Sequence, residues 1–175
     1  MKLRFAVVFA VSAIVANVAT VAAAPWLINA FVMHRIAQAA GGVNRALAAP
    51  RADANARTVV RPSPDLLYTA CVFDISERPL HISAPVPDSY ASVAGFAADT
   101  SNFFALNDAG VVAGPDGHQR FDVVLALEAD AAPPGARVVV APSAKGLVLF
   151  RTLITRDADL PRLRELQAQQ RCDPD

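Results

Sequence analysis

The run from Leu67 to Asp74, LYTACVFD, decides the fold class of this chain. Its apolar residues Leu67, Cys71 and Phe73 lie at odd-numbered positions. Tyr68 and Asp74 lie at even-numbered positions. Because successive side chains of a strand point to opposite faces, this spacing gives one apolar face and one more polar face. The run therefore predicts a half-buried strand of an antiparallel sheet.

Similar short runs follow along the chain, separated by turns rich in Pro, Gly, Asn and Asp. Their close intervals leave no room for crossover helices, which indicates a mainly β, antiparallel sandwich or jelly-roll-like domain. The further runs are Pro79–Ala84, Tyr90–Ala97, Phe103–Leu106, Val111–Val112, Phe121–Glu128, Arg137–Ala141 and Gly146–Ile154. The end of the chain differs, because Leu160, Leu163 and Leu166 recur at helical spacing after Asp157 or Asp159. This pattern predicts a short C-terminal helix.

The N-terminal segment has a different character. Lys2 and Arg4 precede 29 residues without a formal charge, Phe5–Met33. A helix rises 1.5 Å per residue, so about 20 residues cross the roughly 30 Å hydrocarbon core of a bilayer. We expect one permanent transmembrane helix. The alternative is a secretory signal cut near Ala23, although the apolar stretch is longer than the usual 7–15 residues of such signals.

The chain divides by composition into three parts, a membrane anchor (1–33), an Ala- and Arg-rich juxtamembrane stalk (34–61) and a β domain (62–175). The anchor carries two basic residues, the stalk five arginines and one acid, and the β domain nine basic and fifteen acidic residues. The acidic domain has no basic face to neutralise phosphates, so nucleic acid is not an expected partner. The lipid bilayer is an expected partner, because the N-terminal segment is long and apolar enough to cross it.

Charge also bears on the orientation of the anchor. Basic residues flank both of its ends, so the positive-inside rule alone does not decide. The membrane potential disfavours moving Lys2, Arg4 and the amino terminus outward, at about 2.3 kcal/mol per charge per 100 mV. We therefore expect a single-pass protein of the inner (cytoplasmic) membrane, with the N-terminus inside and the domain in the periplasm.

The stretch SPDLLYTACVFDISERPLHISAPVPDSYASVAGFAADTSNFFALND, residues 63–108, carries several motifs. They are an Asp before a Leu-Tyr pair, an apolar run ending in Asp, a Pro on either side of a strand, and an aromatic-rich segment ending in Asn-Asp. In order they are Asp65, Leu67-Tyr68, Phe73-Asp74, Pro79, Pro85, Asn102-Phe103-Phe104 and Asn107-Asp108. This pattern resembles the Domain of Unknown Function 1254 family in its short, membrane-anchored bacterial form. Arg78 departs from the pattern, since a small residue is more usual before the proline. The resemblance implies a fold and a location, but no mechanism.

No catalytic, cofactor or metal-ligand motif stands out in the sequence, so no cofactor is expected. The preferred interpretation is an envelope protein that works as a non-catalytic binding or assembly module, with another small membrane-anchored envelope protein as a candidate partner. The alternative is a periplasmic hydrolase acting on a small ester or glycan. Ser92, His81 and Asp74 could supply a triad for it, although Ser92 lacks a G-x-S-x-G elbow. Enzymatic activity therefore stays open.

Three side chains are candidates for a shallow ligand cleft. Tyr68 and Asp74 share the polar face of their predicted strand, and His81 points away from its apolar neighbours Leu80 and Ile82. The alternative is that the three occupy ordinary solvated positions, with Asp74 satisfying the amides of a turn.

Cys71 and Cys172 are the two cysteines of the chain. If the domain is exported, they could form a disulfide. The alternative is that Cys71 is a small buried hydrophobic residue and Cys172 a free thiol near the chain end.

Overall fold

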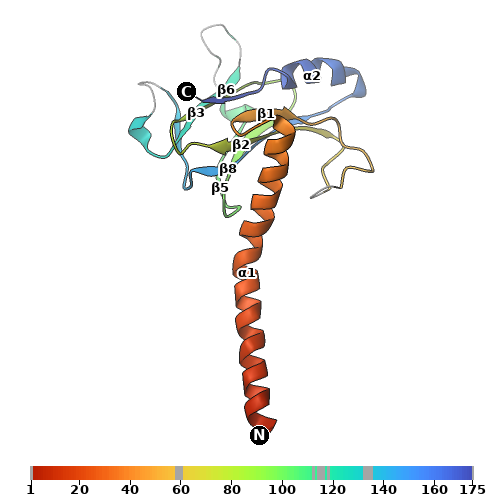
Figure 1. Cartoon of the computed structure of the whole chain (residues 1–175). Helices are drawn as coiled ribbons and strands as arrows, with labels where there is room; N and C mark the ends of the chain where they lie inside the picture. The colour runs from red at the N-terminus through yellow and green to blue at the C-terminus, as the bar shows by residue number, and fades with distance from the viewer. Residues whose placement is uncertain are drawn as a thin grey trace.

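The computed structural model describes residues 2–57, 61–111, 113, 117, 119–131 and 136–174. It contains a single long helix, α1 (Lys2–Ala40), followed by a β domain that closes with the short helix α2 (Leu160–Gln167). Figure 1 shows α1 as a stem that projects from one side of the domain, with the N-terminus at its far end. The predicted long apolar N-terminal helix and the predicted short C-terminal helix are both present.

The described strands form two sheets. Sheet A has five strands in the order β1-β2-β8-β4-β5, and sheet B has four in the order β7-β6-β3-β9. All neighbouring pairs are antiparallel except β6 and β7, which are parallel. The strands are β1 (Arg45–Ala48), β2 (Leu66–Asp74), β3 (Leu80–Pro85), β4 (Ala91–Ala97), β5 (Asn102–Asn107), β6 (Arg120–Ala126), β7 (Val138–Val140), β8 (Lys145–Leu153) and β9 (Arg171–Pro174). The predicted mainly β class is confirmed.

The two sheets pack face to face around one core, so the domain is a sandwich. Alternate residues of each strand point inward, as the period of two requires. Sheet A contributes Phe73, Val93 and Phe150, all at most 1% exposed. Sheet B contributes Ile82 and Val123, equally buried. The alternation read from the run around Cys71 therefore identified the buried face of β2.

Helix α2 closes one end of the sandwich. Its Leu163 packs with Leu67 and Ile154 in a small second cluster beside the main core. Gln167 Nε2 donates to the carbonyl oxygens of Ala49 and Tyr68, at 3.1 and 2.9 Å. The amphipathic spacing of the C-terminal leucines thus reflects packing against the ends of the strands.

Part of the segment expected to be a stalk, 34–61, belongs to the sandwich. Residues 45–48 form β1 and pair with β2, with Ala46 opposite Cys71. Helix α1 ends just before this strand, at Gly41 and Gly42, which both have positive φ. Glycine adopts such angles without steric cost, so the chain can turn sharply from helix into strand. The expected boundary at residue 62 is therefore too late for the β domain.

Helix α1 has two parts that differ in their surroundings. Residues 2–28 are exposed along their length, apart from the half-buried Ala24. The remaining turns are covered on one face only, by the domain, through Asn29, Val32, Met33, Ile36, Ala37 and Ala40. This spacing of three and four residues is that of a single helix face. The last turns of the expected anchor, 1–33, thus already belong to the contact with the domain.

The exposed part is long and apolar enough to cross a membrane, by length and composition, and sits near the N-terminus as an anchor or a signal sequence would. Counted from Phe5 to Trp26 it would span about 33 Å at 1.5 Å per residue. That length matches the roughly 30 Å hydrocarbon core of a bilayer.

Candidate functional site

The three side chains expected to line a ligand cleft do not meet in one. Tyr68 and Asp74 lie on the outer face of sheet A, at opposite ends of β2. Six residues at about 3.3 Å each separate them by roughly 20 Å. His81 lies on the outer face of sheet B, on the other side of the sandwich. The structure thus places the three in separate environments.

Asp74 closes a turn at the end of β2. Its Oδ1 accepts hydrogen bonds from Ser76 Oγ at 2.6 Å and from the Ser76 amide at 3.1 Å. Lys145 Nζ lies 3.2 Å from the other carboxylate oxygen. The hydrogen bond from the Ser76 hydroxyl is the main reason that the pKa of Asp74 lies below its ordinary value of 3.8. The carboxylate therefore has the role of turn stabilisation.

His81 is held by a neighbouring strand. Its Nε2 lies 2.8 Å from Asp122 Oδ1 across the β3–β6 pair, on an exposed surface. Ser83, two residues along the same face, accepts a hydrogen bond from Arg120. Ser92, the nucleophile of the possible triad, lies in β4 of sheet A and faces away from the core. Ser92, His81 and Asp74 are therefore not brought together.

Cys71 and Cys172 form a disulfide, with their Cα atoms 6.5 Å apart. Cys71 lies in β2 of sheet A and Cys172 in β9 of sheet B, and both are fully buried. Cys172 stands in a strand paired to β3, opposite Ile82, so the bond ties the chain end to the core and one sheet to the other.

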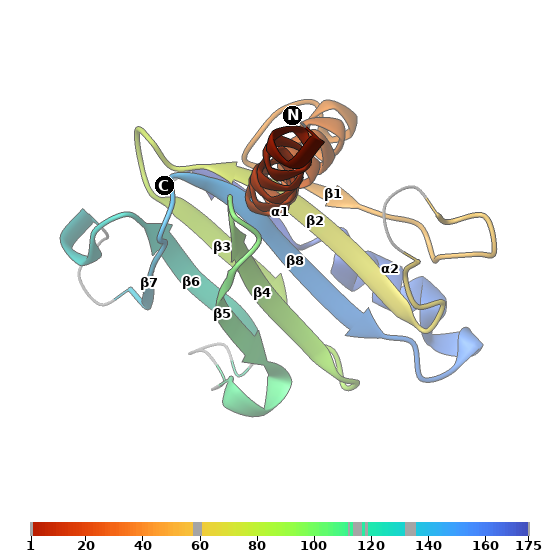
Figure 2. The ribbon, with the colours of Figure 1, turned by 90° about the horizontal axis from the view of Figure 1, so that it is seen from below.

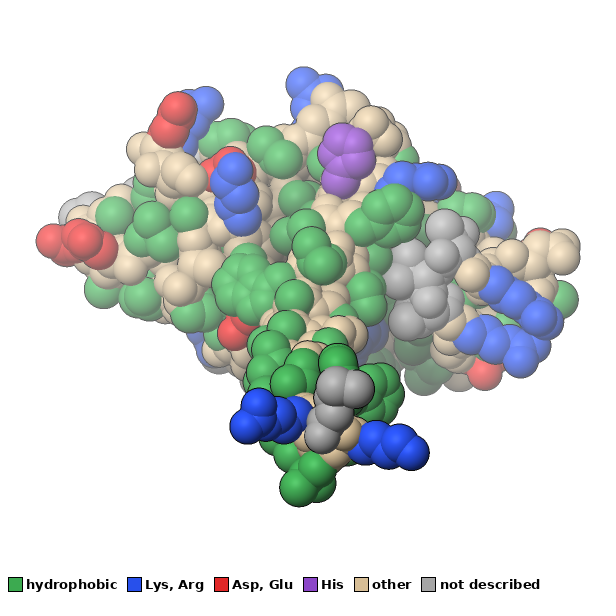
Figure 3. Space-filling model, turned by 60° about the horizontal axis from the view of Figure 1, so that its bottom comes forward, with side chains coloured by type: hydrophobic (Ala, Val, Ile, Leu, Met, Phe, Trp, Pro, Cys, Tyr) green, Lys and Arg blue, Asp and Glu red, His purple; other side chains and the backbone are tan. Residues whose placement is uncertain are grey.

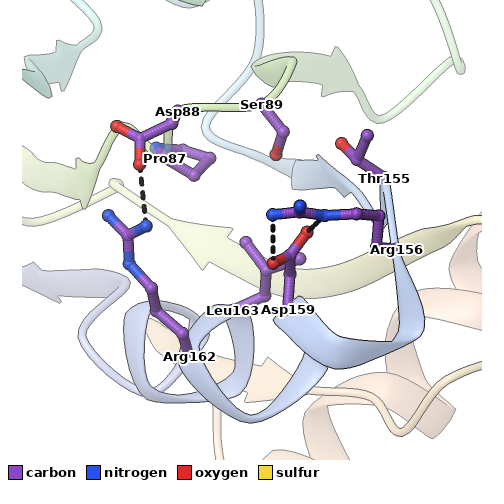
Figure 4. A pocket seen from close by; sticks show the side chains of 8 residues that line it. All are labelled: Pro87, Asp88, Ser89, Thr155, Arg156, Asp159, Arg162 and Leu163. Carbon is purple, nitrogen blue, oxygen red and sulfur yellow. Dashed lines mark hydrogen bonds and ion pairs between the residues drawn. The ribbon is translucent and has the colours of Figure 1, made fainter.

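A small pocket of about 200 Å³ lies between α2 and the loop before β4 (Figure 4). Its two arginines are both paired with carboxylates, Arg156 with Asp159 at 3.0 Å and Arg162 with Asp88 at 2.7 Å. The hydrogen bonds from Arg156 hold the pKa of Asp159 below its usual value. With its charges neutralised and a volume below the 300–1,000 Å³ typical of ligand sites, this pocket offers little to a substrate.

A larger hollow lies where α1 meets the outer face of sheet A. This groove has a volume of about 720 Å³ and a mainly apolar lining. The lining side chains come from α1, β1, β2, β8 and the segment between β1 and β2, and the apolar ones include Val32, Ile36, Leu47, Leu66, Ala70, Leu147 and Leu149. Tyr68, Arg61 and Arg151 supply its polar groups. We call this hollow the helix groove.

Polar side chains form a row across sheet A next to the helix groove. Arg151 in β8 pairs in register with Tyr68 on one side and Ser92 on the other, and Ser92 pairs with Asn107 of β5. Arg151 and Ser92 also line a second hollow of about 370 Å³ beside the groove. Ser92 is 7% exposed, and its Oγ has no hydrogen-bond partner among the described residues.

Sequence reasoning missed this row. The even spacing of Tyr68 pointed to the outer face of β2, but its neighbours Arg151 and Ser92 come from strands far along the chain. Their juxtaposition depends on the strand order and register, which no single segment specifies. Among the described residues, no group of three or more His, Cys, Asp or Glu could hold a metal ion.

The fold of this chain also occurs in a solved protein. The VPA0106 protein from Vibrio parahaemolyticus is similar over 86% of this chain, with a TM-score of 0.62 and 15% identity. An uncharacterised protein from Burkholderia cenocepacia is similar over 86% of this chain, with a TM-score of 0.47 and 12% identity. This chain covers 35% and 39% of those two chains, so it spans little more than a third of their length.

Family membership rests on the sequence. No curated protein matches this chain. Residues 43–174 match the family described as protein of unknown function (DUF1254), and the matched region begins just before β1 and ends with β9. The resemblance seen in the motifs of residues 63–108 is thereby confirmed. The chain belongs to the DUF1254 family of proteins of unknown function.

Proposed function

We propose that this protein is a membrane-anchored envelope protein that works as a non-catalytic binding or assembly module. The exposed part of α1 would cross the inner membrane with its N-terminus in the cytoplasm, and the sandwich would lie in the periplasm. The partner would be another small membrane-anchored envelope protein. The observation that carries this proposal is the docking of the sandwich on its own anchor helix.

Specific contacts hold the sandwich against α1. Asn29 is 9% exposed, and its Nδ2 donates to the carbonyl oxygens of Ala97 and Ala98 at 3.2 and 2.9 Å. An amide in an otherwise apolar helix is costly in lipid, but these two bonds satisfy it. Val32 and Ile36 continue the contact over the sheet. A domain fixed in this way presents the same edge to any neighbour in the membrane, which lowers the ordering cost of association.

The edge strand β5 is the surface that we assign to the partner. None of the described strands pairs with its outer side. Charged residues and prolines commonly keep the edge strand of a sheet from pairing with another chain. The sequence of β5, NFFALN, contains neither. The rings of Phe103 and Phe104 fill the space that a Cβ at Gly95 would need, so they hold β5 close to β4. An added strand is a common mode of protein recognition.

The comparison with the Vibrio protein supports the proposal that this fold can act together with a further protein segment or domain. There the part similar to this chain is about a third of the protein, and further chain accompanies it. The similarity reaches the fold alone, so the identity of the partner is part of the proposal.

The test uses a photo-crosslinking residue in place of Ala105, an exposed residue in the middle of β5, in the full-length protein in bacterial membranes. A matched control carries the same residue at Val140, which is 51% exposed on the edge strand β7 of sheet B. We expect a discrete adduct with a second membrane protein from position 105 and none from position 140. No adduct at position 105, or equal adducts from both, would overturn the proposal.

Two further variants separate pairing from chemistry. Ala105→Lys places a charge on the edge and should abolish the adduct formed from a crosslinker at Asn107, whereas Val140→Lys should leave it intact. His81→Ala, on the far face, should also leave the adduct intact. Loss of the adduct with His81→Ala in a folded protein would contradict the assignment to β5.

A further inference from the structure

We propose that the outer face of sheet A holds an anionic phospholipid from the membrane that α1 enters. Its phosphate would lie at Arg151 and Ser92, and one acyl chain would lie in the helix groove. This inference goes beyond partner binding: the lipid would lie on the outer face of sheet A, where β5 lines one side of the hollow at Arg151 and Ser92, whereas the partner would pair with the outer edge of β5.

The orientation of the domain puts this face toward the bilayer. In Figure 1 sheet A lies on the side of the domain from which α1 projects, and sheet B lies beyond it. In Figure 2, seen from below and almost along α1, β2, β8 and β4 run across the view. The outer face of sheet A therefore looks along α1 toward its N-terminal part. A membrane crossed by that part would lie opposite this face.

The height of the groove above the membrane is set by α1 itself. If Trp26 marks the interface, as aromatic residues commonly do, Val32 and Ile36 lie about 9 and 15 Å farther along the helix. One leaflet contributes about half of the roughly 30 Å hydrocarbon core, so an acyl chain reaches about 15 Å. A lipid with its phosphate at Arg151 and one acyl chain in the groove can therefore keep its second acyl chain in contact with the bilayer.

The polar groups of the groove suit a negative charge, since two arginines, the exposed Arg61 and Arg151, line it. Arg151 lines both the helix groove and the adjoining hollow, so it stands at their junction. No ion pair or hydrogen bond is made by its guanidinium among the described residues, unlike Arg156 and Arg162. An oxyanion held there would satisfy the guanidinium and give Ser92 Oγ an acceptor.

The surroundings of Arg151 favour an amphiphile over a free anion. Leu149 lies two residues away on the same face, and Ala70 and Ala94 pair with it in register. Figure 3 shows hydrophobic side chains gathered along α1 and where it meets the domain. A soluble phosphate would leave this apolar surface in water, whereas a phospholipid would cover it.

The test uses the full-length protein in nanodiscs of phosphatidylcholine that contain one-third phosphatidylglycerol with a photoactivatable acyl chain. We expect adducts at groove residues of β2 and β8. Arg151→Gln should reduce them at least about tenfold, because a charge-assisted hydrogen bond is lost. The matched control is Arg45→Gln, which removes an exposed charge of β1 outside the groove and should leave the adducts unchanged.

A second variant tests the chain rather than the charge. Ala70→Leu keeps the strand apolar but narrows the groove, so it should lower groove adducts while the melting temperature holds. The same experiment with millimolar inorganic phosphate identifies the source of the anion. Phosphate should not displace the lipid. Equal labelling of wild type and folded Arg151→Gln, labelling confined to residues outside the groove, or displacement by inorganic phosphate would each overturn the inference.

Discussion

The outer faces of the two sheets differ in their surroundings. This is so although inward and outward side chains alternate along both β2 of sheet A and β3 of sheet B. On sheet B the outward positions carry ordinary surface pairs, such as His81 with Asp122 at 2.8 Å. On sheet A they carry Ala70 and Leu149, and α1 crosses part of them. The difference shows that the period of two identifies a buried face but not the environment of the opposite one. For sheet A, that environment includes the protein's own helix α1.

The largest effect is expected where the two sheets are joined. Replacing Cys71 and Cys172 by alanine removes a bond that closes a segment of 101 residues between the sheets. We expect a loss of about 2–5 kcal/mol in the free energy of unfolding. Hydrogen exchange should rise in both sheets alike, because the bond joins them. Chemical denaturation of the wild type and the double variant measures the loss, and reductant should bring the wild type to the variant's value. A loss confined to one sheet in hydrogen exchange would show that the faces unfold separately.

The next effect should concern sheet A alone. Asn29→Ala removes the two hydrogen bonds to Ala97 and Ala98 and should cost about 1–3 kcal/mol in the docking of α1. Amide exchange should rise in the β4–β5 turn and in β1, while β3 and β6 keep their protection. Asn55→Ala, which alters an exposed loop residue, is the control. Unchanged exchange in the β4–β5 turn would show that the docking does not depend on Asn29.

The sequence predicts some strands of the sandwich much better than others. The strands with clear alternation, such as β2 and β8, were found within a few positions. β1 was missed because RALA has neither alternation nor bulk, and β9 because four residues after a helix carry no strand signal of their own. Residues 111–112 were expected in a strand, but Val111 is not in one, and Val112 lies outside the described residues.

The candidate site was harder to anticipate than the fold. Asn29 does not stand out in the sequence, because the helix face that it shares with Val32 and Ile36 is hidden among apolar neighbours. Arg151 stands between Phe150 and Thr152 in a strand whose inward residues were evident. Its place beside Ser92 follows from the order β8-β4, which is a property of the whole sheet.

On sheet B a small effect is expected. The His81–Asp122 pair is exposed, with side chains 41% and 65% accessible. Such pairs contribute about 0–1 kcal/mol, so His81→Gln and Asp122→Asn should leave the midpoint of urea unfolding nearly unchanged. A double-mutant cycle measures the coupling between the two side chains. A coupling of several kcal/mol would mean that the outer face of sheet B is more than a solvated surface.

The smallest expected effect is a change in the pKa of one carboxyl group of sheet A, that of Asp74. In the folded protein the pKa of Asp74 is lower than 3.8, first because of the hydrogen bond from Ser76. This interaction therefore stabilises the fold above the unfolded pKa, and the stabilisation is lost as the pH falls through the lower, folded value. Ser76→Ala should raise the pKa of Asp74, which NMR titration of the carboxyl carbon reports. Ser89→Ala, whose hydroxyl bonds Leu153 instead, should leave it unchanged.

The most direct test of this account is to measure which outer face looks at the membrane. A fluorophore is attached at residue 105 on sheet A or at residue 122 on sheet B, with the disulfide of Cys71 and Cys172 closed. The full-length protein is then reconstituted in phosphatidylcholine vesicles that carry a quencher on the lipid headgroups. The account predicts strong quenching at residue 105 and little at residue 122. Equal quenching at both positions, or stronger quenching at residue 122, would contradict it.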